Sequence, residues 1–347
     1  MWEVIGILLK IGIVVGVSLG AVSYLILVER KVAAWAQDRI GPNRAGPFGL
    51  IQPLADGAKM ILKEDVIPHY VAKSLYLLAP IVALVAAIIG FAVVPFGPVG
   101  STSPTLAGHP VEFQIAPGVD IGILYVLAIG SLGVYGVILA GWASNNKYSF
   151  LGGLRSSAQL ISYEIPLGMS ILGMVMIAGS MDLTAIIHWQ DRHVWGVFAQ
   201  PIGFLLFLIS GFAETNRLPF DLPESEQELV GGFHTEYSAM KFGMFFLGEY
   251  LHVITVSFLT VILFFGGWDL PFFLDQSQTG WFFGLLKMGV IVGKVALMIL
   301  FMMWVRWTLP RFRYDTLMDL AWKSLIPIAL INFAATAIVL QAVRAFR

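Results

Sequence analysis

The chain has 347 residues, of which 58% are hydrophobic and only 12% are charged, and its formal net charge is -1. A soluble surface needs roughly a quarter of its residues charged, so this composition excludes an ordinary soluble domain, and the net charge argues against a nucleic-acid binder. With no cysteine, the chain can form no disulfide and can hold no iron–sulfur cluster.

Apolar segments long enough to cross a membrane recur along the whole chain. A hydrocarbon core about 30 Å thick needs about 20 apolar residues per helix, and eight segments meet this length. We therefore predict an all-α integral membrane protein with about eight transmembrane helices, folded as a single polytopic domain over residues 1–347. The predicted spans are approximately residues 2–28, 74–94, 119–142, 158–180, 195–213, 239–266, 281–305 and 324–343.

The distribution of lysine and arginine predicts how these spans are oriented. Positive residues are retained on the cytoplasmic side, and most of those outside the spans lie in every second connection. Only Arg192, Arg344 and Arg347 lie on the opposite side. Both termini are therefore predicted on the outer (periplasmic) side. The predicted cytoplasmic connections are approximately residues 29–73, 143–157, 214–238 and 306–323.

The first cytoplasmic connection is predicted to contain a short amphipathic helix. Glycines and prolines break the chain before it, and Pro53 is tolerated in the first turn of a helix. From there Gln52, Asp56, Lys59 and Lys63 recur at helical spacing, with apolar residues on the other side. This pattern indicates a helix lying in the membrane interface. The periodicity leaves two roles open, a peripheral anchor and one wall of a cavity for a lipid-soluble ligand.

Three carboxylates lie within or at the end of predicted spans, where a charge near the bilayer centre costs roughly 2.5 to 3.5 kcal/mol. They are Glu164, Glu214 and Glu249, with His252 one helical turn beyond Glu249. A buried ion pair that fixes helix packing explains any one of them. Their occurrence on three spans favours a proton path or a coupling-ion site, because clustered carboxylates at low dielectric can take up and release protons. A transporter substrate site is less favoured, since no inverted repeat is visible.

The connection after the fifth span is unusually acidic. Pro219 stops the span from continuing, and Asp221 is placed to cap a short helix that opens at Leu222 or Pro223 and ends at the glycines 231 and 232. Capping explains one or two carboxylates and not six. The acidic residues are Glu214, Asp221, Glu224, Glu226, Glu228 and Glu236.

Four segments of the chain carry a resemblance to a known family. They are GPNRAGPFGLIQPLADGAK (41–59), LGGLRSSAQLISYE (151–164), AETNRLPFDLPESEQELVGGFHTEYSAMKF (213–242) and TLPRFRYDTLMDLAWK (308–323). With these segments in this order, the chain resembles the quinone-site membrane subunit of proton-pumping NADH:quinone oxidoreductase, respiratory complex I. This is the H subunit of the bacterial enzyme and subunit 1 of the mitochondrial one. A more distant kinship extends to membrane subunits of energy-converting hydrogenases and formate hydrogenlyases.

The resemblance implies a division of labour among subunits. FMN and iron–sulfur clusters would lie in partner subunits, quinone would be the substrate, and this chain would bind no cofactor or metal of its own. The implied partners are the peripheral-arm iron–sulfur and quinone-site subunits, the small membrane subunits, the antiporter-like subunits and membrane quinone. The implied location is the bacterial inner (plasma) membrane, or the mitochondrial inner membrane for an organelle protein.

The resemblance also implies roles for individual residues. Quinone would enter from the bilayer beside the first span and the amphipathic helix, and its reduction would be coupled to proton translocation. The residues implied for the quinone path are Glu29, Arg30, Arg39, Asp56, Arg217 and Arg306. Those implied for the proton path are Glu164, Glu214 and Glu249, and those implied for an acidic coupling loop are Asp221, Glu224, Glu226, Glu228 and Glu236.

Three other functions are weighed against this interpretation. A passive scaffold would use its acids to dock basic surfaces of the peripheral arm, so charge-neutral variants would lose assembly. A membrane subunit of a related energy-converting hydrogenase-type complex is the second alternative, and the long acidic segment and the GPNRAGP loop favour the quinone enzyme over it. An independent ion transporter would give ion flux in liposomes that contain this chain alone.

Overall fold

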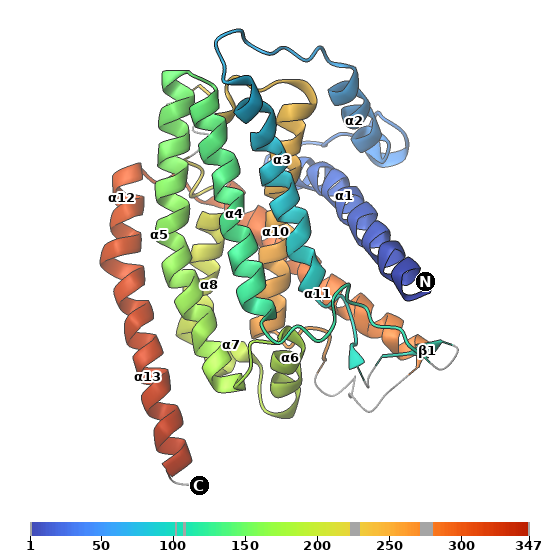
Figure 1. The fold of residues 1–347 in the computed structure, drawn as a ribbon, viewed down its shortest axis with the longest axis vertical. Coiled ribbons are helices and arrows are strands. Elements are labelled where there is room, and N and C mark those ends of the chain that lie inside the picture. The colour runs from blue at the N-terminus through green and yellow to red at the C-terminus, as the bar shows by residue number, and fades with distance from the viewer. Residues whose placement is uncertain (1, 101–102, 107–108, 223–229, 271–279, 346–347) are drawn as a thin grey trace.

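The computed structural model describes residues 2–100, 103–106, 109–222, 230–270 and 280–345. In these residues the protein is a bundle of long helices (Figure 1), and the strands β1 (Thr105–Leu106) and β2 (His109–Pro110) pair antiparallel. Within this described part of the chain, seven helical segments are long and apolar enough to cross a membrane, which confirms the predicted all-α membrane fold. Their main helices are α1 (Trp2–Ala36), α3 (Lys73–Ile89), α4 (Gly122–Ala143), α5 (Lys147–Ala178), α10 (Ala239–Phe264), α11 (Trp281–Thr308) and α13 (Ile326–Ala345).

Shorter elements extend or connect these helices. The turn η2 (Gly90–Val93) extends α3, and α12 (Tyr314–Asp319) with the π-helical turn η5 (Leu320–Leu325) leads into α13. The fifth predicted span, 195–213, corresponds to α7 (Gly196–Ala199) and α8 (Pro201–Glu214), and α8 has only 14 residues. The remaining elements are η1 (Pro47–Gly49), α2 (Gln52–Leu62), α6 (Leu183–Arg192) and η4 (Gly232–His234).

α4 and α5 approach each other through glycine. A Cβ atom added to Gly141 of α4 would lie 2.8 Å from the carbonyl oxygen of Ser149 and 3.1 Å from the Cα atom of Gly153, both on α5. Small residues therefore allow the two helices to pack closely, as they do at many membrane helix contacts. α5 begins at Lys147 rather than near residue 158. Glu164 consequently lies near the middle of α5, and not two turns from its start as the predicted boundary placed it.

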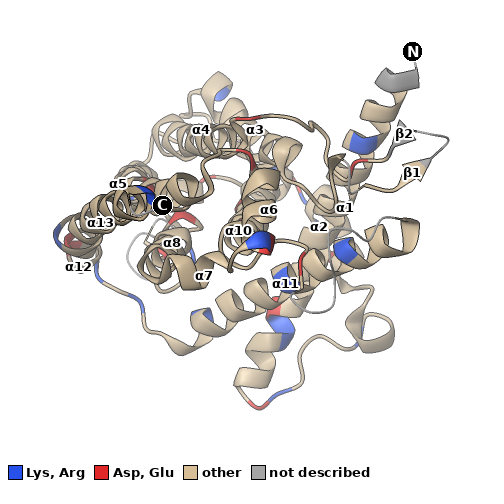
Figure 2. Cartoon of the chain, turned by 90° about the horizontal axis from the view of Figure 1, so that it is seen from below, with Lys and Arg blue, Asp and Glu red and all other residues tan. Residues whose placement is uncertain are grey.

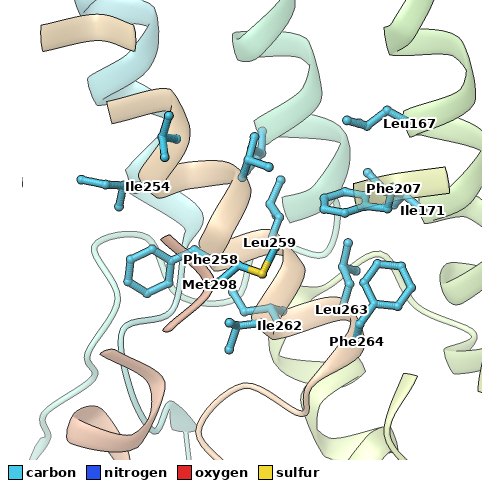
Figure 3. Close-up of a cluster of buried hydrophobic side chains, with 14 of the residues drawn as sticks. Leu167, Ile171, Phe207, Ile254, Phe258, Leu259, Ile262, Leu263, Phe264 and Met298 are labelled. Atoms are coloured by element: carbon cyan, nitrogen blue, oxygen red, sulfur yellow. The ribbon is translucent and has the colours of Figure 1, made fainter. Parts of the chain in front are cut away.

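α10 is the central helix of the bundle. In the most apolar 18-residue stretch of α10, 78% is buried inside the protein. The corresponding share is 17% for the segment that contains α1 and 11% for the segment that contains α13. Phe258 and Leu259 of α10 pack with Met298 of α11, and Phe264 packs against Phe207 of α8 with ring centres 5.5 Å apart (Figure 3). A helix buried on all sides is usually apolar all round, and α10 is so apart from a few residues that include Lys241, Glu249 and His252. Charged residues on it therefore need partners inside the protein.

α1 and α13 lie at opposite sides of the bundle (Figure 1). Their outer faces are apolar: Val17 of α1 is 66% exposed, and Ile331 and Ile338 of α13 are each 68% exposed. Seen from the end of the bundle in Figure 2, most of the ribbon carries neither acidic nor basic residues. Apolar surface of this extent suits a lipid environment, whereas water would make it unfavourable.

α2 confirms the predicted short amphipathic helix. Leu54, Ile61 and Leu62 are 71%, 71% and 84% exposed on one side of it. On the other side, Asp56 forms an ion pair of 2.5 Å with Arg30 of α1. This contact holds α2 beside α1 with its apolar side outward. Its placement in the membrane interface stays a prediction.

Candidate functional site

A cluster of buried charges joins α1, α10, α11 and the segment that follows α8. At its centre Glu29 of α1 is only 5% exposed. Its carboxylate accepts hydrogen bonds from Nη1 of Arg217, at 2.8 and 3.0 Å, and from the hydroxyl of Tyr250, at 2.5 Å. Arg306 of α11 also donates to it. A buried carboxylate is stable only when it is paired and hydrogen-bonded, and these donors meet that requirement.

Arg217 connects this carboxylate to a second one. While Nη1 contacts Glu29, Nε lies 2.7 Å from Oε1 of Glu249, and the guanidinium lies 4.0 Å from the centre of the Tyr250 ring. Burial acts to lower the pKa of Arg217, but the carboxylates of Glu249 and Glu29 outweigh it and raise this pKa above its usual value. Arg217 is therefore a permanent positive charge held between two carboxylates.

The path of the chain after α8 places Arg217 inside the protein. Asn216 adopts a positive φ of 50°, a conformation that asparagine tolerates better than most residues, and it ends the helical direction. The side-chain amide of Gln159 on α5 then donates to the carbonyls of Ala213 and Phe220, each at 2.8 Å. Gln159 thus fixes both ends of this turn to α5. Arg217, which lies between the two ends, is thereby directed toward α1 and α10.

A cavity of about 380 Å³, which we call the α1 cavity, lies between α1, α10 and α11. Apolar side chains such as Phe246 and Trp307 line it together with charged ones. Arg217 does not line the α1 cavity. It contacts Glu29 and Tyr250, which do. Four residues of the predicted quinone path line the cavity directly. Asp56 does not line it but pairs with Arg30, which does. The four are Glu29, Arg30, Arg39 and Arg306.

A second cavity, of about 120 Å³, lies inside the bundle between α3, α4, α5, α8 and α10, and we call it the inner cavity. Glu164, Glu214 and Glu249, predicted for a proton path from three separate spans, all line it. Water needs about 10–15 Å³ of such space per molecule, so the inner cavity has room for several. The structure thus brings these three carboxylates to one hydratable space.

Each of these carboxylates has a partner of a different kind. The hydroxyl of Ser131 on α4 donates to Glu164, and Nε2 of His252 lies 3.2 Å from Oε1 of Glu214. Glu249 pairs with Arg217. The expected repulsion among clustered carboxylates is therefore offset by side chains from neighbouring helices, a contribution that the linear sequence does not display.

The acids of the predicted coupling loop lie apart from the inner cavity wherever the structure describes them. Asp221 pairs with Arg311 at 2.7 Å. Glu236 accepts hydrogen bonds from Tyr70, at 2.7 Å, and from Asn146, at 2.5 Å, and so ties three connections together. The hydrogen bond to Glu236 raises the pKa of the Tyr70 hydroxyl. Glu224, Glu226 and Glu228, with the helix predicted around them, lie outside the described residues.

The two lysines of α11, Lys287 and Lys294, line neither of these cavities. Lys294 donates to the carbonyls of Phe265, Gly267 and Asp269 at 2.7, 3.0 and 2.6 Å. It therefore holds the segment that directly follows α10. Among the described residues, no group of three or more His, Cys, Asp or Glu side chains is placed to hold a metal ion.

Sequence reasoning missed several residues of the site. Ser131, Tyr250 and Asn216 carry no charge and belong to no recognisable spacing, although Tyr250 directly follows Glu249 in the chain. Gln159 is the one of these residues that a reading of the sequence could have found, because a polar amide in an apolar span needs a hydrogen-bond partner. The role of Arg217 as a bridge had no signal, because it depends on contacts with residues far away in the chain.

The fold and the site together define a class of protein. A helical bundle of membrane length that buries ion pairs beside hydratable cavities is an integral membrane protein with ionisable groups placed inside it, and such groups usually mark ion or substrate pathways. The sequence model of the family described as NADH dehydrogenase matches residues 9–337. The chain belongs to this family.

Curated relatives agree with this assignment. The chain is 53% identical to a protein of Leptospira biflexa over 318 residues, covering 90% of this chain and 88% of the relative. It is 47% identical to a protein of Cytophaga hutchinsonii over 324 residues, covering 92% of each. It is 46% identical to a protein of Geobacter metallireducens over 347 residues, covering 97% and 96%. All three are named as the H subunit of an NADH-quinone oxidoreductase, so the resemblance found in the sequence is confirmed.

Proposed function

We propose that this chain is the membrane subunit of an NADH-quinone oxidoreductase that forms much of the quinone path and couples quinone reduction to proton translocation. Family membership and the names of the relatives support the enzyme complex. The geometry of the two cavities supports the division of roles within the chain. As a subunit without redox centres of its own, the chain would not turn over alone.

The α1 cavity suits the quinone path. Its mixed lining offers apolar contact for a tail and a head-group ring, and Arg30, Arg39 and Arg306 supply donors for carbonyl oxygens. α2 stands beside it with its apolar side outward, as expected of a wall next to a lipid entrance. Reduction of a quinone to a quinol takes up two electrons and two protons. The electrons would come from partner subunits, and the protons must come through groups near the cavity.

The single observation that carries the coupling proposal is the position of Arg217. It contacts Glu29, which lines the α1 cavity, and Glu249, which lines the inner cavity. Any event that neutralises Glu29 weakens its hold on Arg217 and strengthens the attraction between Arg217 and Glu249. Because the charges are buried, such a change is poorly screened by solvent. A charge change at the quinone thereby alters the stability of the ionised form of Glu249.

A change in the ionisation of Glu249 would then alter the protonation of the other carboxylates of the inner cavity. Glu214 and Glu164 line the same cavity, and water in it can relay protons between them. The acidic loop would stand between this path and the peripheral arm, with the small and antiporter-like membrane subunits at the flanks of the bundle. The bacterial inner membrane is the proposed location, and FMN and iron–sulfur clusters are assigned to partner subunits.

The test is a pair of neutral variants, Glu249→Gln and Glu214→Gln, assembled in the complete complex in native membranes. We expect each to assemble and to lose most quinone-coupled proton translocation. Oxidation of NADH by an artificial acceptor at the peripheral arm should stay unchanged. Full quinone reduction with full proton translocation in both variants would contradict the proposal, and loss of assembly in both would favour the scaffold.

A further inference from the structure

We propose that His252 carries protons together with Glu214, so that the two side chains act as one proton-holding pair in the inner cavity. This inference deepens the proposed function and rests on it. The pair joins α10 to α8 by an imidazole nitrogen and a carboxylate oxygen 3.2 Å apart. The neighbouring carboxylates of the cavity have a hydroxyl and a guanidinium as partners, neither of which changes charge near neutral pH.

The placement of His252 is that of a group that exchanges protons with its surroundings. It lies one turn after Glu249 on α10, so the two side chains share a face of the helix. The side chains of His252 and Glu214 are 23% and 15% exposed inside the bundle, and both line the inner cavity. A histidine that only filled space in the core would be enclosed by apolar groups. This one faces a hydratable space and a carboxylate.

Gly130 of α4 leaves the pair open to the cavity. A Cβ atom at this position would lie 3.7 Å from Oε1 of Glu214 and 3.9 Å from Cε1 of His252. Glycine therefore leaves unoccupied a position on α4 where a side chain would touch both groups. The next residue, Ser131, is the donor to Glu164. Two consecutive residues of α4 thus border two of the three carboxylates.

A histidine–carboxylate pair lowers the cost of holding a proton in a buried site. With one proton, the pair is either an imidazolium with a carboxylate or an imidazole with a carboxylic acid, and its net charge is zero in both forms. Moving the proton from Nε2 to the carboxylate breaks one N–H bond and forms one O–H bond without creating net charge. An isolated charge at low dielectric costs far more than a neutral pair. Imidazole is also the side chain that changes charge between about pH 5 and 8.

Other titratable groups line the same cavity from three of the surrounding elements, whereas the described residues of α3 and α4 that line it are not titratable. They are Glu164 on α5, Glu249 on α10 and His234 on η4, besides Glu214 itself on α8. Glu249 differs from these groups because it pairs with the guanidinium of Arg217. His234 is the other imidazole of the cavity and serves as the matched control.

The experiment uses His252→Asn and His234→Asn in the complete complex in native membranes. Quinone-coupled proton translocation is measured from pH 5.5 to 8.5, beside NADH oxidation by an artificial acceptor. In the His252→Asn variant we expect translocation to fall on the order of tenfold, less than for a sole acid–base group because Glu214 and water remain. We also expect the pH profile of translocation in this variant to differ from that of the wild type, because the exchangeable imidazole proton is lost. The His234→Asn variant should keep the wild-type pH profile.

The outcomes separate this inference from the proposed function. If Glu214→Gln abolishes translocation while His252→Asn keeps the wild-type pH profile, the inference is wrong and the proposed function stands. The same conclusion follows if His234→Asn, and not His252→Asn, alters the profile. If none of Glu214→Gln, Glu249→Gln and His252→Asn affects quinone reduction or translocation, both fail. A lower rate with an unchanged pH profile in His252→Asn would show a purely structural role.

Discussion

Glu29, beside the α1 cavity, and Glu214, in the inner cavity, are held in different ways. Glu29 accepts hydrogen bonds from two guanidiniums and a tyrosine hydroxyl and is almost fully buried. Glu214 has one imidazole partner and keeps some exposure to its cavity. Guanidiniums stay charged at every physiological pH, whereas an imidazole does not. The first region therefore fixes its charges in place, and the second allows its charge to change.

The comparison also explains why a bridge between the regions is needed. A cluster of permanent charges transmits a change by moving or by altering its attraction to a neighbour, and a titratable pair responds by taking up or losing a proton. Arg217 belongs to the first region and touches Glu249 of the second. Its removal tests whether the two regions are one unit.

The largest effect is expected for Arg217→Met. The change removes the cation that both Glu29 and Glu249 contact, although Glu29 keeps its contact with Arg306, and breaking a buried ion pair in this way costs about 3 to 5 kcal/mol. We expect a strong loss of assembled complex, measured by the amount and the melting temperature of the complex in detergent. Arg217→Lys keeps the charge without the forked geometry and should be less damaging. Normal stability of the methionine variant would show that the cluster is not coupled as described.

A smaller effect is expected for Tyr250→Phe. The variant keeps the ring beside Arg217 and removes only the hydroxyl that donates to Glu29 at 2.5 Å. A hydrogen bond to a charged group contributes about 1.5 to 3 kcal/mol, and Glu29 is too buried for water to replace the donor fully. The melting temperature of the complex should fall while its quinone-reductase activity remains measurable. An unchanged melting temperature would indicate that the cluster reorganises freely.

Ser131→Ala makes the corresponding change in the inner cavity. It also removes one hydroxyl donor from a carboxylate, Glu164, but water in the cavity can take its place. We therefore expect a cost of about 0.5 to 1.5 kcal/mol, below that of Tyr250→Phe. Comparing the melting temperatures of the two variants tests the difference between the regions. A larger loss at Ser131 than at Tyr250 would reverse the comparison.

The smallest effect on stability is expected for Gly130→Ala. The added methyl group would lie at ordinary contact distance from Glu214 and His252, so it should fit within about 0.5 kcal/mol. It covers part of the pair, and we expect slower proton translocation with assembly unchanged. Gly152→Ala is the contrasting variant, because its Cβ atom would lie 2.7 Å from the backbone of Gly232. That variant should impair folding; equal behaviour of the two would contradict the described packing.

Much of the fold could be predicted from the sequence, because the bilayer restricts what a chain can do. Spanning segments must be helical and about 20 residues long, and their apolar composition is visible at once. The ends of the helices are harder to predict from the sequence. The start of α5 carries several small and polar residues among its apolar ones, and α4 packs closely against it. Similarly, α8 is shorter than the span predicted there.

The sequence by itself determined the membrane class, the family and which charged residues needed an explanation, since composition, segment length and motif order are properties of the linear chain. The tertiary structure decided which charges meet. Glu29 and Arg217 are separated by 188 positions, and their contact depends on how α1 packs beside α10 and how Gln159 fixes the turn after α8. The free energy of a buried charge is set by its neighbours in space, and those neighbours come from different helices.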